Sequence, residues 1–214
     1  MIITASTHAA TPSEASLDLD DCEVLIGQRQ ASAYKKWRAE MQALSQKGDR
    51  QAIVALAGVA NNVMACHEEA LVPEQGWSMS LSTPGGTTET QSPTGIPDIG
   101  KRPGVLADLK QLVDRTHSAG AFDPAYRRIS AEWVTKYSSV LQDRLAQAYE
   151  DAAGAYQSDC VLKRAIGKRD LQFSCAADRR VLAQLVPLVP ADVRAQADKR
   201  AAEWAKALNP ALPD

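Results

Sequence analysis

The four cysteines are the residues whose chemistry the sequence constrains best. Their number is even and no two form a C-x-x-C pair, which argues against a zinc site and a thioredoxin-like redox centre. We therefore predict two local disulfides, each joining neighbouring elements in one half of the chain. The alternative is four buried free thiols, because free cysteine is a common core residue. Four cysteines allow three connectivities, and the local one pairs Cys22 with Cys66 and Cys160 with Cys175.

The histidines do not form a metal-binding pattern. His67 is followed by Glu68 and Glu69, but a zinc peptidase helix needs a second histidine four residues after the first, where this chain has leucine. His8 and His117 are distant from His67 in the sequence. We therefore predict no metal site.

The segment from Gly95 to Arg102 approaches the pattern of a phosphate-binding loop. It consists of G-I-P-D-I-G-K-R, and Arg102 stands where that loop needs a Ser or Thr to bind Mg²⁺. Pro97 stiffens backbone that would have to wrap around a phosphate, and no predicted strand precedes the segment. We therefore predict no nucleotide site and no cofactor.

Catalytic motifs are sparse, and the sequence leans against an enzyme without deciding the question. The chain has no G-x-S-x-G nucleophile elbow. Cys66 and His67 are adjacent, but consecutive helical residues point about 100° apart and so do not face each other. A carboxylate pair in a polar cleft could still hydrolyse peptidoglycan of the cell envelope. The glutamates near loops or on helix faces are Glu68, Glu69, Glu74, Glu89 and Glu132.

A long Pro/Gly/Ser/Thr-rich excursion, residues 73–104, is the feature most suited to binding. Residues 72–104 contain five prolines and six glycines, and the segment far exceeds the roughly 4–6 residues of an ordinary connection. Trp77, Met79 and Leu81 alternate with serines at the period of a strand, and the Pro-Gly-Gly at 84–86 signals a turn. We predict a small β-hairpin whose three large apolar residues contact a partner. The alternative is that they fold back onto the helices.

A run of basic residues brackets the loop that the second predicted disulfide would close. Such a patch can receive an acidic partner or lipid headgroups, although a solvated connector between helices is the simpler interpretation. The residues are Lys163, Arg164, Lys168, Arg169, Arg179 and Arg180.

Hydrophobic periodicity predicts an all-α protein, a single bundle of six or seven helices. Apolar residues recur every three or four positions in each helical segment, and alanine is abundant while aromatic residues make up only 5%. We expect a flexible leader over residues 1–17 and one helical domain over 18–214. The predicted helices cover residues 19–46, 50–70, 103–118, 124–156, 160–166, 174–186 and 190–208.

The first two predicted helices form an antiparallel hairpin. Gly48 stops the first helix and Asp49 caps the second, leaving a very short link. Cys22 and Cys66 then lie at the open end of this hairpin. Because the first helix is longer by about two turns, the segment before Ala31 must bend or unwind for the cysteines to meet.

Charge and hydropathy argue against two classes of partner. No run of roughly 18 apolar residues exists, so we predict no membrane span. Residues 1–100 carry 6 Lys/Arg against 12 Asp/Glu, whereas residues 101–214 carry 18 against 14. Nucleic-acid binding usually shows a stronger basic excess than this second half has. Residues 1–16 lack the basic and apolar regions of a signal peptide. Their composition fits either a leader that follows a cleavage site or an ordinary disordered cytoplasmic N-terminus.

Together these features favour an exported protein that binds another protein, of the inhibitor or immunity type. Disulfides would place it in the periplasm or outside the cell, whereas free thiols would suit the cytoplasm. Two alternatives stay open: a cell-envelope hydrolase that uses a carboxylate, and an intracellular structural or assembly subunit. The partner and the oligomeric state do not follow from the sequence.

Overall fold

The computed structural model describes residues 22, 25, 27, 29, 32–75, 79–83, 86–90, 98–162 and 172–208. Within these residues the fold is an all-α bundle with one small β-hairpin, as predicted. The helices of the first half are α2 (Ser32–Gln46), α3 (Arg50–Gln75), the short η2 (Ile99–Lys101) and α4 (Pro103–Ala119). The second half contains α5 (Pro124–Lys136), η3 (Gln142–Arg144), α6 (Leu145–Tyr156), the π-helical η4 (Gln157–Leu162), α8 (Gln172–Leu185), η6 (Val186–Leu188) and α9 (Ala191–Leu208).

The ends of the helices follow from local residue chemistry. The side chain of Asp123 accepts a hydrogen bond from the backbone N–H of Ala125 at 2.9 Å, and Pro124 occupies the first helical position of α5. Gly48 has φ +81°, a left-handed conformation that ends α2. Asp49 then accepts a hydrogen bond from the backbone N–H of Ala52 at 2.9 Å and caps α3. The predicted start and stop signals of these helices are therefore confirmed.

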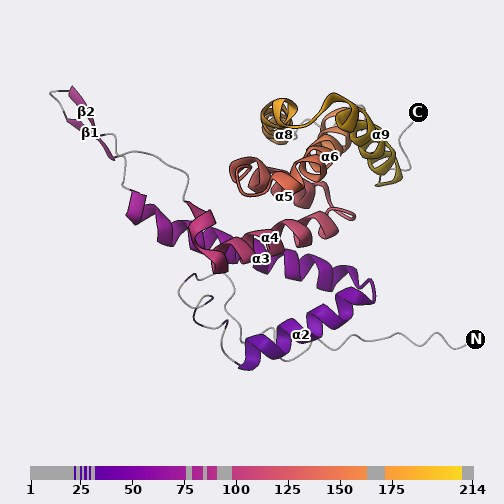
Figure 1. Ribbon diagram of the computed structural model, residues 1–214, viewed down its shortest axis with the longest axis horizontal. Helices are drawn as coiled ribbons and strands as arrows, with labels where there is room; N and C mark the ends of the chain where they lie inside the picture. Colours follow the sequence, from indigo (N-terminus) through magenta and orange to yellow (C-terminus); the bar gives the residue numbers. More distant parts are fainter. Residues whose placement is uncertain are drawn as a thin grey trace, which may run out of the picture.

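Two apolar clusters hold the helices together. The larger lies among α3, α4, α5, α6, α8 and α9 and includes the fully buried Leu109, Leu141 and Leu185. The smaller joins α2 to the first part of α3 around Trp37, which is 1% exposed. Figure 1 shows α2 on the opposite side of α3 and α4 from the remaining helices. In the described residues, no helix is both long enough and apolar enough to cross a membrane.

The predicted first helix, residues 19–46, is interrupted. Cys22, Leu25 and Gly27 are helical, but Arg29 lies in a turn and α2 begins only at Ser32. This break lets Cys22 reach Cys66, with 5.2 Å between their Cα atoms. The predicted bend before Ala31 and the predicted disulfide are both confirmed.

The predicted long helix over residues 124–156 is wrong, because the structure divides it into α5 and α6. Tyr137 ends α5 with φ −112° and ψ 34°, and turns and η3 follow before α6 begins at Leu145. Ser138 and Ser139 occupy this break, and serine competes for backbone hydrogen bonds. Folding back at this point lets α5 and α6 pack against each other and buries Leu141 completely.

Two other predicted boundaries also differ from the structure. The helix predicted to end at residue 70 continues as α3 to Gln75, beyond the buried Leu71. The separate helix predicted over residues 160–166 is instead a π-helical turn, Gln157–Leu162, that continues directly from α6. Residues 163–166 of that prediction lie outside the described part of the chain.

Candidate functional site

The β1–β2 hairpin is the candidate binding element. β1 (Met79–Thr83) pairs antiparallel with β2 (Gly86–Thr90), in a register that places Leu81 opposite Thr88. The predicted hairpin is therefore confirmed. Trp77 lies outside the described residues, and for Met79 and Leu81 only the backbone is described, so their role as apolar contacts stays a prediction.

The hairpin forms a sheet of only two strands, in the order β1–β2. Each strand therefore has one inner edge that pairs with its neighbour and one outer edge whose N–H and C=O groups have no strand partner within the described residues. Figure 1 shows the hairpin apart from the helices, beyond the C-terminal end of α3. Its outer edges are in position to pair with an added strand.

The C-terminal half of α3, at the root of the hairpin, is fixed by a disulfide and an ion cluster. The Cys22–Cys66 bridge is followed by His67, whose Nε2 lies 3.0 Å from Asp108 Oδ2 on α4. Arg29 donates two hydrogen bonds to the same carboxylate, at 2.7 and 2.8 Å. Burial opposes the ionisation of Asp108, but the hydrogen bonds from His67 and Arg29 outweigh it and lower its pKa to about 2.

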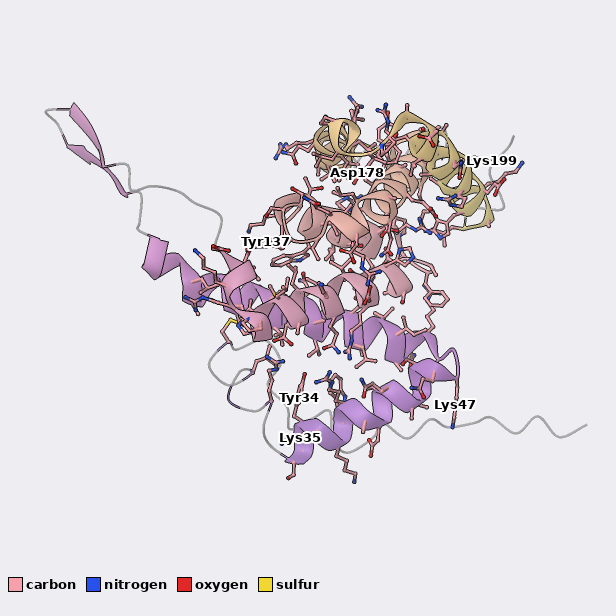
Figure 2. All side chains as sticks on the ribbon, viewed as in Figure 1. Tyr34, Lys35, Lys47, Tyr137, Asp178 and Lys199 are labelled. Carbon is pink, nitrogen blue, oxygen red and sulfur yellow. A yellow bond between two sulfur atoms is a disulfide. The ribbon has the colours of Figure 1, made fainter. Side chains whose placement is uncertain are left out.

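A second cluster attaches the same half of α3 to the end of α5. The hydroxyl of Tyr137 donates a hydrogen bond to Glu68, and Lys136 lies 2.6 Å from the same carboxylate. Burial, and then the hydrogen bond to Glu68, raise the pKa of Tyr137 above its ordinary value. Tyr137 also stacks on Trp133 with ring centroids 5.9 Å apart. Figure 2 shows Tyr137 where the end of α5 lies beside α3.

Of the candidate carboxylates of a hydrolase, the three whose side chains the structure describes do not share a pocket. The carboxylate of Glu68 accepts a hydrogen bond from Tyr137 and forms an ion pair with Lys136. Glu132 instead lines a groove between α5 and α8, which Glu68 does not line. Burial raises the pKa of Glu132. Glu69 is exposed on α3. The side chains of the other two, Glu74 and Glu89, lie outside the described ones.

The comparisons with known proteins show no relationship: the chain matches no family model, no curated protein and no solved structure. Its function must therefore be argued from the geometry of its own residues.

Sequence reasoning missed a buried polar network between α4, α5 and α6. Asp151 has no exposed surface, and both of its carboxylate oxygens lie 2.9 Å from His117 Nδ1. Ser130 donates a hydrogen bond to it at 2.9 Å, and Arg127 lies at 3.5 Å. The sequence separation of 34 between His117 and Asp151 hides this pair from any local motif.

This network has half of the arrangement that hydrolases use. A buried carboxylate that orients a histidine is shared with catalytic triads, but a triad also needs a nucleophile hydrogen-bonded to the other ring nitrogen. His117 Nε2 has no such hydroxyl or thiol partner among the described residues. The guanidinium of Arg127 stacks instead on Trp204 at 3.9 Å, so the network connects α9 to the bundle. We assign it a structural role.

The second disulfide lies beside another buried ion cluster. The Cα atoms of Cys160 and Cys175 are 5.4 Å apart, which confirms the predicted pair. Arg128 contacts Asp178 at 2.5 Å and Asp159 at 2.8 Å. Figure 2 shows Asp178 on α8, close to α5 and α6. This cluster joins the disulfide to the core.

The predicted basic patch is only partly described. Arg179 and Arg180 are exposed on α8, and Lys163, Arg164, Lys168 and Arg169 lie outside the described residues. The patch therefore stays a prediction. Among the residues whose placement is described, no group of three or more His, Cys, Asp or Glu side chains could hold a metal ion.

Proposed function

We propose that this chain is an exported protein that binds another protein, of the inhibitor or immunity type, by adding a strand of the partner to its β1–β2 hairpin. The observation that carries the proposal is the two-stranded sheet with its open outer edges, in a chain whose other described elements are all helical. An isolated two-stranded hairpin is marginally stable in water, and a third strand would stabilise it. Strand addition is a common mode of protein recognition.

The attachment of α3 supports this proposal. The Cys22–Cys66 bridge, the His67–Asp108 contact and the Tyr137–Glu68 hydrogen bond all hold the helix that leads into the hairpin. A fixed root reduces the conformational entropy that is lost when a partner binds. Trp77, Met79 and Leu81 would then supply apolar contacts beside the backbone hydrogen bonds.

The disulfides support export. Such bonds persist in oxidising compartments and are rare in the reducing cytoplasm, so the Cys22–Cys66 and Cys160–Cys175 bridges favour the periplasm or the extracellular space. Intact mass of the native protein, with thiol alkylation before and after reduction, tests this part. Four alkylated thiols before reduction would overturn export and leave the binding proposal to its own test.

The binding test uses the full chain as bait in extracts of the source cells, followed by affinity measurements with the captured protein. Deleting Gly76–Pro97 should abolish binding while the far-ultraviolet circular dichroism of the helices and the thermal midpoint stay unchanged. Thr88→Pro, which removes a backbone donor from β2, should weaken binding, whereas Thr88→Val should not. Full binding by the deletion variant, or loss of its helicity, would overturn the proposal.

A further inference from the structure

A groove of about 710 Å³ lies between α2 and α4, on the side of the bundle away from α5 and α6. Residues of α3 form part of its lining, because α2 and α4 both pack on that helix. Its volume falls within the range of roughly 300–1,000 Å³ that is typical of small-molecule sites. The lining includes Gln42, Ser45 and Gln46 of α2, Ile53 and Leu56 of α3, and Ala107, Lys110, Gln111, Asp114 and Arg115 of α4. The one carboxylate among them, Asp114, is ion-paired with Arg144 at 3.0 Å.

Arg115, which lines this groove, and Arg38, which lines only the small cavity beside it, have no acidic partner among the described residues. Arg38 of α2 donates a hydrogen bond to the amide oxygen of Gln111 at 3.2 Å, and Arg115 of α4 donates one to the carbonyl of Leu56 at 3.4 Å. Neither forms an ion pair with a carboxylate among the described residues. The partly buried Arg29 and Arg128, in contrast, each bind an aspartate directly.

The surroundings of Arg115 concentrate positive charge. Burial, and then the neighbouring charge of Arg38, lower the pKa of Arg115 below its ordinary value. Both arginines line a small cavity together with Arg29 and Asp108. The carboxylate of Asp108 is already hydrogen-bonded by Arg29 and His67, so three guanidinium groups share one engaged carboxylate. The cavity itself, at about 10 Å³, is too small for a ligand, but an anion in the groove beside Arg115 would relieve this imbalance.

The small cavity and the groove are neighbours, because Gln111 and Arg115 line both of them. Tyr34 extends from α2 toward the α3–α4 layer and lines the cavity as well (Figure 2). The positive charge therefore lies at one part of the groove, while Ile53, Leu56 and Ala107 give another part an apolar lining. This combination fits a molecule with an anionic head and an apolar body.

We propose that this groove is a binding site for a small organic anion, whose carboxylate or phosphate is held by Arg38 and Arg115 and whose apolar body contacts Ile53, Leu56 and Ala107. Guanidinium groups suit both head groups because their planar N–H donors match two oxygens at once. Amide and hydroxyl groups of Gln42, Ser45 and Gln46 supply further polar contacts along α2. This site is separate from the hairpin, so it stands or fails independently of the proposed function.

Isothermal titration calorimetry of the full chain with four probes tests the site. Octanoate supplies the anion and the chain, 1-octanol the chain alone, and inorganic phosphate the anion alone. We expect octanoate to bind with one-to-one stoichiometry and the other two to bind at least about tenfold more weakly, as loss of one charge-assisted contact implies. Equal binding of octanoate and 1-octanol, or no binding of octanoate, would overturn the proposal. A helical glutamate-rich peptide is the fourth probe, and its binding in place of octanoate would assign the groove to a partner helix instead.

Variants then locate the site. Arg115→Met and Arg38→Met should each weaken octanoate binding at least about tenfold. Arg200→Met, which removes the same charge from an arginine paired with Glu150, should not. Unchanged octanoate affinity in Arg115→Met would overturn the assignment.

The thermal midpoint of Arg115→Met separates a binding role from a structural one. Removing an unpaired, partly buried cation removes a desolvation penalty, so the ligand-free variant should melt no lower than the wild type. A midpoint several degrees lower would show that Arg115 is needed for the fold, and would overturn its assignment as a ligand-binding residue.

Discussion

The imidazole Nδ1 of His117 lies 2.9 Å from both carboxylate oxygens of Asp151, a residue with no exposed surface. This contact connects the last turn of α4 to α6. Its hydrogen bond raises the pKa of His117 above the ordinary value of 6.5, and burial opposes that rise only in part.

The first prediction concerns pH. Because the folded-state pKa of His117 is raised, its contribution to stability is fully present below about pH 6.5 and is lost as pH rises through the folded-state pKa. The free energy of unfolding, measured by urea denaturation across a pH series, should therefore fall over this interval more steeply in the wild type than in His117→Gln. Parallel curves for the two proteins would contradict the assignment.

The second prediction concerns the buried carboxylate. Asp151→Asn removes the ion-pair partner of Arg127, which is only 6% exposed. The free energy of unfolding should drop by about 3–5 kcal/mol. Asp143→Asn is the matched control, because that side chain is 63% exposed and should change stability by less than about 0.5 kcal/mol. A loss at Asp151 no larger than at Asp143 would show that the network does not support the fold.

The third prediction concerns a close approach of backbone and side chain. A Cβ atom at Gly120 would lie 2.5 Å from Arg127 Cγ and 3.0 Å from the His117 carbonyl oxygen. Gly120→Ala should therefore destabilise the protein by about 1–3 kcal/mol. Gly104→Ala, in α4 with nothing within 4 Å, should be neutral or stabilise by up to about 1 kcal/mol. Thermal unfolding of both variants tests the contrast, which equal midpoints would refute.

The fourth prediction compares the disulfides. The Cys22–Cys66 bridge spans 44 residues and Cys160–Cys175 spans 15. Chain-entropy estimates give about 4 kcal/mol for the longer loop and about 3 kcal/mol for the shorter. Replacing each pair by serine and measuring urea denaturation should reproduce this order. A larger loss of stability on removal of the shorter bridge would contradict this order, unless that removal also disrupts the adjacent Arg128–Asp178 ion pair. A Cys160→Ala/Cys175→Ala variant that also carries Arg128→Met separates the two effects.

The fifth prediction concerns the root of the hairpin. Tyr137→Phe removes the hydrogen bond to Glu68 but keeps the aromatic ring on Trp133. Because Glu68 is charged, we expect a loss of about 1.5–3 kcal/mol. Hydrogen exchange should become faster in the last turns of α3 and stay unchanged in α9. Uniform acceleration across both helices would mean that the contact stabilises the whole bundle and not the root of the hairpin in particular.

Several elements of the fold followed from the sequence by itself. Apolar residues at helical spacing determine the helix class, Gly48 and Asp49 determine one turn, and the Asp123–Pro124 pair determines the start of α5. The alternation around Met79 and the glycines at 85–86 predicted the hairpin. These signals are local, because each depends on residues within a few positions of one another.

The interruption after Tyr137 and the buried polar clusters were decided only by tertiary structure. Helical periodicity continues through Ser138, so no local signal excludes one long helix. The packing of α6 against α5 stabilises the chain with a turn at this point. Likewise, Arg38 and Arg115, which line one small cavity, come from α2 and α4 and lie 77 positions apart in the sequence. Asp151 contacts His117 at a sequence separation of 34. Sequence patterns report each helix's own preferences, whereas the positions of charges in a low-dielectric interior depend on which helices pack together.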